Sequence, residues 1–225
     1  MAYQLVIFDW DGTVMDSTGR IIACMHQAGA DLCLPVLEDD AVREIIGLCL
    51  PEALRTLYPG IGDRDLERMR ERYAVHFVAA EASPSRLYPG ARETLAALRA
   101  AGLRLAVATG KSRKGLDRVW ASSGLGDSFD ASRCADETHS KPHPAMVTEL
   151  LTELGVAPER ALVVGDTSFD LQMARDAGVD RVAVSYGAHP VDRLMNFHPL
   201  AVIDALPQLL PLLGVDCETH FEETV

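Results

Sequence analysis

Residues 5–13 read Leu5-Val6-Ile7-Phe8-Asp9-Trp10-Asp11-Gly12-Thr13, and this stretch decides the fold. Four consecutive apolar residues, two of them β-branched, predict a strand that is buried on both faces, as in a parallel sheet. Asp9 and Asp11 follow the run and can start toward the same side, because successive strand side chains alternate. Asp-x-Asp-Gly by itself is also typical of a turn with two solvated aspartates. Because carboxylates this close repel each other without a cation or shared proton, a magnesium ion is the simplest ligand to expect here.

The composition is that of a globular protein with reduced thiols. The chain has 225 residues, of which 48% are hydrophobic, enough for one large domain or for a domain with a smaller insert. No apolar run predicts a transmembrane helix, and the N-terminus lacks the basic region of a signal peptide. The five cysteines form no Cys-x-x-Cys pair, which indicates a cytoplasmic setting. The net charge of −12 disfavours nucleic acid and anionic membranes as partners, so an anionic substrate needs a local positive site.

Two regions with different periodicity follow the first strand. Helical spacing predicts helices over about residues 17–34, 38–46, 51–57 and 63–81, with no strand between residues 16 and 86. Later strands are predicted over residues 103–108, 129–132, 161–164, 181–184 and 201–203, alternating with helices. This alternation predicts an α/β fold, a parallel sheet with helices on both faces. The expected domains are a core of residues 1–15 and 87–225 and an all-helical insert of residues 16–86, with an acidic, mobile tail over residues 216–225.

Polar residues end the predicted strands, and such sheets bind ligands at the carboxyl ends of their strands. The strand ends and one loop supply Asp9, Asp11, Thr109, Gly110, Lys141, Asp166 and, four residues further on, Asp170. Asp9 and Asp166 are expected to bind Mg²⁺ through side-chain oxygens, and Asp11 through its backbone carbonyl. Asp170 is expected either to orient a water ligand or to pair with Lys141.

The same group of residues suits a bound phosphoryl group. The Thr109 hydroxyl, the amides of Gly110 and Lys111, and the Lys141 ammonium group are donors for anionic oxygens. The sequence has no phosphate-binding Gly-rich motif and no Ser or Cys placed as a nucleophile at a strand end. The nucleophile is therefore expected to be Asp9, as in aspartyl-phosphate enzymes, with Asp11 as general acid and base.

Other residues near these positions are expected to have structural roles. We expect Arg113 and Lys114 on a solvated helix face, because charge runs usually lie there. His143 is expected to make a local hydrogen bond, since no second His or Cys has metal-ligand spacing. Trp10 is expected in the core, on the far side of the first strand.

Four segments, in order, resemble the motifs of the haloacid dehalogenase superfamily. They are FDWDGTVMDS at residues 8–17, ATG at 108–110, KPHP at 141–144 and VGDTSFD at 164–170. The branch that the chain most resembles contains phosphoglycolate phosphatases and β-phosphoglucomutases. The resemblance implies a Rossmann-like core, a helical cap where the insert lies, dependence on Mg²⁺ and a covalent aspartyl-phosphate.

The resemblance also points to residues that select the substrate. Arg43-Glu44-Ile45-Ile46-Gly47 is similar to a cap segment that faces the active site in this branch, so Arg43 and Gly47 are expected to contact the substrate. The segment continues as Leu48-Cys49-Leu50-Pro51, which is more apolar than expected for binding glycolate.

The expected function is magnesium-dependent hydrolysis of a small phosphorylated metabolite, as in phosphoglycolate phosphatases, by a monomer or weak homo-oligomer. One alternative is a phosphosugar mutase, which passes the same phosphoryl group to a sugar hydroxyl. A dehalogenase would require neither a carboxylate at Asp11 nor a metal. A non-catalytic phosphoryl-sensing or scaffold protein is a further alternative, but it would have no physical reason to keep Thr109, Lys141 and every carboxylate.

Overall fold

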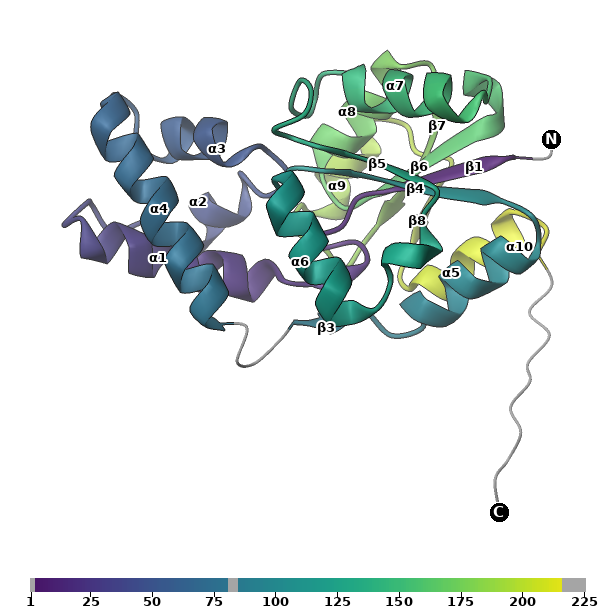
Figure 1. Cartoon of the computed structure of the whole chain (residues 1–225). Coiled ribbons are helices and arrows are strands. Elements are labelled where there is room, and N and C mark those ends of the chain that lie inside the picture. The colour runs from purple at the N-terminus through teal and green to yellow at the C-terminus, as the bar shows by residue number, and fades with distance from the viewer. Residues whose placement is uncertain (1–2, 81–84, 216–225) are drawn as a thin grey trace.

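A six-stranded parallel sheet lies at the centre of the computed structural model, which describes residues 3–80 and 85–215 (Figure 1). Across the sheet, the strands are β5 (Ala131–Cys134), β4 (Arg104–Thr109), β1 (Leu5–Phe8), β6 (Ala161–Gly165), β7 (Asp180–Val184) and β8 (Ala201–Ile203). Leu5 of β1 lies opposite Arg104 on one side and Ala161 on the other. All four β1 residues are fully buried, which is the outcome that their unbroken apolar run predicts.

Helices cover both faces of this sheet, so the predicted α/β fold is confirmed. Val6 and Phe8 pack in one hydrophobic core with α5 (Ala91–Ala100), α6 (Arg113–Ser123) and α10 (Leu209–Leu212). Leu5 and Ile7 pack on the opposite face with α7 (Ala145–Leu154) and α8 (Ser168–Asp176). The α9 helix (Val191–Met195) packs against α8, and short 3-10 helices span Gly126–Ser128, Pro158–Arg160 and Leu206–Gln208. The alternation of side chains along β1 therefore supplies both cores.

Four helices form a separate layer beside the sheet, at the end opposite the N-terminus (Figure 1). They are α1 (Thr18–Asp31), α2 (Asp39–Arg43), α3 (Leu50–Leu57) and α4 (Asp63–Ala79). Their apolar faces enclose a core of their own, in which Met25, Leu54 and Met69 are buried. No helix in the described part of the chain is long and apolar enough to cross a bilayer.

The expectation that residues 16–86 contain no strand is wrong at both ends of this range. Strand β2 (Met15–Asp16) pairs with β3 (Arg86–Leu87) in an antiparallel ladder, with Asp16 opposite Arg86. Each strand has two residues, which is too short for periodicity to reveal. The pair joins the two connections between the helical layer and the sheet. The predicted tail over residues 216–225 lies outside the described residues.

Candidate active site

Three buried carboxylates converge at the carboxyl end of the sheet. Asp9 follows β1, Asp166 follows β6, and Asp170 lies in the first turn of α8. One carboxylate oxygen of each lies within 4.8 Å of the others. The convergence follows from parallel pairing, because β1 and β6 end together and the Asp9 amide donates to the Val164 carbonyl at 2.9 Å. The structure thus brings together three of the four acidic residues that the sequence places at the strand ends: Asp9, Asp166 and Asp170.

Asp166 is held by hydrogen bonds from both sides. The Thr13 hydroxyl donates to Oδ1 at 2.9 Å, and the Ala188 amide donates to Oδ2 at 2.7 Å. The second bond requires a close approach of the loop after β7, since a Cβ atom on Gly187 would lie 2.4 Å from Oδ2. Burial, followed by the negative charge of Asp170, raises the pKa of Asp166 to about 7.

Lys141 is the cation of this cluster, and its side chain is fully buried. Its Nζ atom lies 2.5 Å from Asp9 Oδ1 and 2.6 Å from Asp170 Oδ1. Burial alone would lower the pKa of Lys141, but the charges of Asp170 and Asp9 outweigh burial and raise it. Of the two roles expected for Asp170, the structure shows the pairing with Lys141. Asp170 also closes a capping box with Thr167 at the start of α8, which fixes its orientation.

The cluster has the donor set of a divalent cation site. Asp9 Oδ2 is buried and has no hydrogen-bond partner among the described residues. Burial raises the pKa of Asp9 well above its usual range, and the nearby charge of Lys141 opposes this shift. Three ionised carboxylates and one ammonium group would leave a negative charge in a buried site, which is costly without a cation. Carboxylate oxygens of Asp9, Asp166 and Asp170 lie close enough to one another to hold it.

The Asp11 carboxylate lies apart from this cluster and has different partners. Its Oδ1 atom accepts a hydrogen bond from the Ser17 hydroxyl at 2.5 Å, and its Oδ2 atom pairs with Lys111 Nζ at 2.9 Å. Lys111 Nζ also lies 4.7 Å from the centre of the Phe77 ring of α4. The side-chain role of Lys111, which the sequence leaves open, is therefore a contact with Asp11 and with the helical layer.

Thr109 and Gly110 lie at the end of β4, next to the cluster. Thr109 is buried, and its hydroxyl accepts a hydrogen bond from the Lys111 amide at 3.2 Å. A Cβ atom on Gly110 would lie 2.7 Å from the Gly47 carbonyl oxygen, so a glycine is needed where the helical layer meets this loop. Arg43 is not brought to the site, because its guanidinium group faces Asp40 at 3.7 Å.

A comparison with known families agrees with this geometry. Residues 6–184 match the model of the family described as Haloacid dehalogenase-like hydrolase. The chain belongs to this family. The resemblance expected from the four motifs is thereby confirmed, and the acidic cluster of the hydrolase lies entirely within the matched residues.

Two proteins similar to this hydrolase are named as phosphatases. The Probable phosphatase IndB of Dickeya dadantii (strain 3937) is 34% identical over 210 residues, which are 92% of this chain and 91% of that protein. The phosphoglycolate phosphatase of Nitrosococcus oceani is 32% identical over 218 residues, 94% of this chain and 96% of that protein. These matches confirm that the chain is an enzyme of the phosphatase type.

The fold of the hydrolase is also that of a solved relative. A crystal structure of a hydrolase from Pseudomonas syringae superposes with a TM-score of 0.86. It covers 95% of this chain and 98% of its own, at 24% sequence identity. The agreement includes most of the described residues, so it covers the helical layer as well as the sheet.

His189 of the hydrolase is a buried residue that sequence reasoning missed. Its Nδ1 atom accepts a hydrogen bond from the Ser168 amide at 3.0 Å, so its Nε2 atom carries the proton and donates to the Glu44 carbonyl at 3.2 Å. Arg193 pairs with the carboxylate of the same glutamate. Burial lowers the pKa of His189, which favours this neutral form. The position of His189 after β7, at a strand end, is the signal that could have revealed it.

Three structural expectations around the site of the hydrolase are confirmed. Trp10 is fully buried and packs edge-on against Phe129 in the core. His143 Nδ1 accepts a local hydrogen bond from the Ala145 amide at 3.2 Å. Lys114 is exposed on α6 as expected, whereas Arg113 beside it is half-buried and pairs with Glu137 at 2.8 Å. These residues therefore support the fold around the site.

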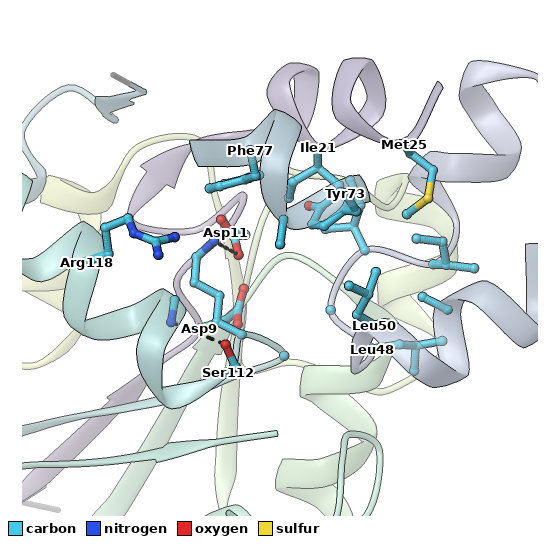
Figure 2. Close-up of a pocket in the computed structure, with 18 residues that line it drawn as sticks. Asp9, Asp11, Ile21, Met25, Leu48, Leu50, Tyr73, Phe77, Ser112 and Arg118 are labelled. Atoms are coloured by element: carbon cyan, nitrogen blue, oxygen red, sulfur yellow. Dashed lines mark hydrogen bonds and ion pairs between the residues drawn. The ribbon is translucent and has the colours of Figure 1, made fainter. Parts of the chain in front are cut away.

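A cavity of about 180 Å³ lies between the hydrolase's helical layer and its sheet (Figure 2). Asp9 and Asp11 line one end of this cavity. The rest is lined by α1, α3, α4 and the loop before α3 on the helical layer, and by α6 and the loop after β4 on the sheet side. Gly47 also lines it, as expected for a substrate-binding position, whereas Arg43 does not. The cavity therefore joins the acidic cluster to the surface of the helical layer.

Proposed function

We propose that this hydrolase is a magnesium-dependent phosphomonoesterase that transfers the phosphoryl group first to Asp9 and then to water. The observation that carries the proposal is the convergence of Asp9, Asp166, Asp170 and Lys141 at one end of a substrate-sized cavity. Mg²⁺, when bound, would neutralise charge on the phosphoryl oxygens as phosphorus becomes five-coordinate. The other tasks fall to side chains of this chain.

Asp9 is the proposed nucleophile because its Oδ1 atom is held by Lys141 while Oδ2 has no hydrogen-bond partner among residues 3–80 and 85–215. A bond forms from Asp9 to phosphorus as the bond from phosphorus to the leaving oxygen breaks. The Thr109 hydroxyl, the Gly110 amide and the Lys141 ammonium group are the proposed donors to the phosphoryl oxygens. Water then attacks phosphorus and releases Asp9 and inorganic phosphate.

Asp11 is the proposed acid and base, because its side chain lines the cavity but stands outside the carboxylate cluster. In the first step it would protonate the leaving oxygen, and in the second it would deprotonate the attacking water. Ser17 and Lys111 hold its two oxygens and so fix its direction. The proton that Asp11 gives in the first step is regained in the second.

Replacing Asp11 with Asn tests these two steps separately. With p-nitrophenyl phosphate, whose leaving group needs little protonation, we expect one burst of p-nitrophenolate per active site followed by a stall. The phosphorylated enzyme should accumulate, because no base activates the water. Steady-state hydrolysis should fall by about 10²–10⁴-fold, the usual contribution of a general acid or base. Rapid-quench kinetics and intact-protein mass measure both quantities, and unchanged turnover would assign the acid and base role to another group.

Added Mg²⁺ should stabilise the folded protein more at about pH 7 than at about pH 5. Asp166 binds its proton more tightly when folded, so in the metal-free protein this residue costs stability as pH rises from its ordinary pKa of 3.8 to about 7. Over the same range the carboxylates become available to Mg²⁺, and at one hundred times Kd binding adds about 2.7 kcal/mol. Melting temperatures with Mg²⁺ and with chelator measure this difference. Asp166→Asn should reduce the stabilisation by Mg²⁺. If the unaltered chain melts at the same temperature with Mg²⁺ and with chelator, the proposed cation site is contradicted.

We also propose that residues 16–86 act as a cap inserted into a catalytic core of residues 1–15 and 87–225. The separate hydrophobic core of helices α1 to α4 and the cavity beneath them support this division. A cytoplasmic location is consistent with the four described cysteines, which are all free thiols. The proposed oligomeric state is a monomer or weak homo-oligomer.

A phosphate-release screen over glycolate, sugar, nucleotide and polyol phosphates with Mg²⁺ tests the activity itself. A phosphosugar mutase would convert a sugar phosphate to its isomer, whereas the proposed enzyme releases inorganic phosphate. Absence of phosphate release from the whole panel, without isomerisation, would favour the non-catalytic alternative.

A further inference from the structure

The cavity next to the acidic cluster has two chemically different ends. One end has Asp9 and Asp11, with Phe77 beside Lys111, and the other is walled by Met25, Leu48 and Leu50. Ile21 and Tyr73 also line the cavity. Figure 2 shows Met25, Leu48 and Leu50 on the side of the cavity opposite Ser112 and Arg118. A phosphomonoester with its phosphoryl group at Asp9 would therefore place its organic part against aliphatic and aromatic side chains.

The positively charged side chains of the described cavity lining lie at the end that contains Asp11. Among its described lining residues, the cations are Lys111 and Arg118. Lys111 pairs with Asp11, and Figure 2 shows Arg118 on the same side of the cavity as Asp11. Lys111 is engaged by the Asp11 carboxylate at 2.9 Å, and Arg43, on the helical layer, faces Asp40 instead of the cavity. A carboxylate on the organic part of a substrate would lose its hydration at the apolar end without gaining a cation there.

The cavity is large enough for an organic group of moderate size. Its volume is about 180 Å³, whereas a cavity of roughly 150 Å³ lined by Leu, Ile and Phe is known to hold benzene. The Tyr73 hydroxyl adds one polar atom to the lining of the cavity. Burial raises the pKa of this hydroxyl, which keeps it a neutral donor.

We infer that the preferred substrates are phosphomonoesters whose organic group is a branched alkyl or aryl group, and not a small carboxylate such as glycolate. This inference rests on the proposed phosphomonoesterase function and adds to it the class of the organic group. It separates this chain from its relative named as a phosphoglycolate phosphatase. The physical basis is burial of apolar surface against Met25, Leu48 and Leu50. At this end of the cavity, the described lining residues offer no cation to a substrate carboxylate.

Isobutyl phosphate and phosphoglycolate make a matched pair for the first test, because two methyl groups replace the two carboxylate oxygens at the same branch point. With Mg²⁺ present, we expect kcat/KM for isobutyl phosphate to exceed that for phosphoglycolate by at least about tenfold. Across methyl, ethyl and propyl phosphate, kcat/KM should rise about fourfold per methylene, which corresponds to ~0.8 kcal/mol for each buried CH₂. An equal or higher kcat/KM for phosphoglycolate would overturn the inference.

A variant in the apolar wall connects this preference to the cavity. Leu48→Gln keeps the size of the side chain but adds an amide, and it should reduce the preference for isobutyl phosphate by about tenfold or more. Val36→Gln is the matched control, since Val36 is 94% exposed on the helical layer and does not line the cavity. A preference that survives Leu48→Gln would also overturn the inference.

Binding of two phosphonates separates this inference from the proposed function. Isopentylphosphonate and phosphonopropionate are the same two compounds with a methylene in place of the ester oxygen, so neither can be hydrolysed. Calorimetry with Mg²⁺ should show tighter binding of isopentylphosphonate, with a more negative heat-capacity change. If no ester is hydrolysed but this order of binding holds, the function fails and the apolar site stands. If esters are hydrolysed and the order is absent or reversed, the function stands and the apolar site fails.

Discussion

Replacing Asp9 with Asn is expected to abolish hydrolysis of p-nitrophenyl phosphate in the presence of Mg²⁺. The amide is a poor nucleophile, and it removes one of the charges that would hold the cation. Loss of the covalent route should lower kcat by at least about 10³-fold, or ~4 kcal/mol in the barrier. Steady-state assays measure the loss, and intact-protein mass after rapid quench should show no phosphorylated enzyme. The change is nearly isosteric, so the fold should be preserved.

The control for this prediction is Asp63→Asn, in which the same chemical change is made on an exposed side chain of α4. This variant should keep full activity. If Asp9→Asn retains more than about a tenth of the rate, a barrier change of only ~1.4 kcal/mol, Asp9 is not the nucleophile. Another group near the cavity would then have to attack phosphorus.

Replacing Lys141 with Met is expected to remove activity and to destabilise the fold. The aliphatic part of the side chain is kept, but Asp9 and Asp170 lose the ammonium group that lies 2.5 Å and 2.6 Å from them. Breaking a buried ion pair by removing one partner costs about 3–5 kcal/mol, because the remaining charge stays buried without compensation. Chemical denaturation at about pH 7 measures the cost, and it should be accompanied by loss of phosphate release.

The destabilisation caused by Lys141→Met should be smaller at about pH 5 than at about pH 7. Burial raises the pKa of Asp9 and of Asp166, so lowering the pH lets the cluster take up protons and relieves the repulsion. Lys114→Met is the matched control on the exposed face of α6, and it should change neither the free energy of unfolding nor phosphate release. A Lys141→Met protein with unaltered stability at both pH values would show that the ammonium group does not balance these carboxylates.

Local patterns in the sequence were sufficient to predict the strands of the six-stranded sheet and the acidic end of the site, but not the short strands β2 and β3. The unbroken apolar run of β1 predicts a central buried strand, because a strand with both faces covered has no need for alternation. Parallel strands end at the same edge of a sheet. The sequence therefore predicts that Asp9, Thr109 and Asp166 lie close together, even when the strand order is unknown. Helical spacing likewise revealed α1 to α4, since each has one apolar face.

Only the tertiary structure decided which side chains meet across the helical layer and the sheet. The bond from His189 to the Glu44 carbonyl joins residues 145 positions apart, and Lys111 meets both Asp11 and Phe77. The apolar wall of the cavity combines α1, α3 and α4 with the loop before α3. Periodicity records which face of one element is buried, but not which element covers it. That choice depends on packing between distant segments, which is why the substrate end of the site became visible only in three dimensions.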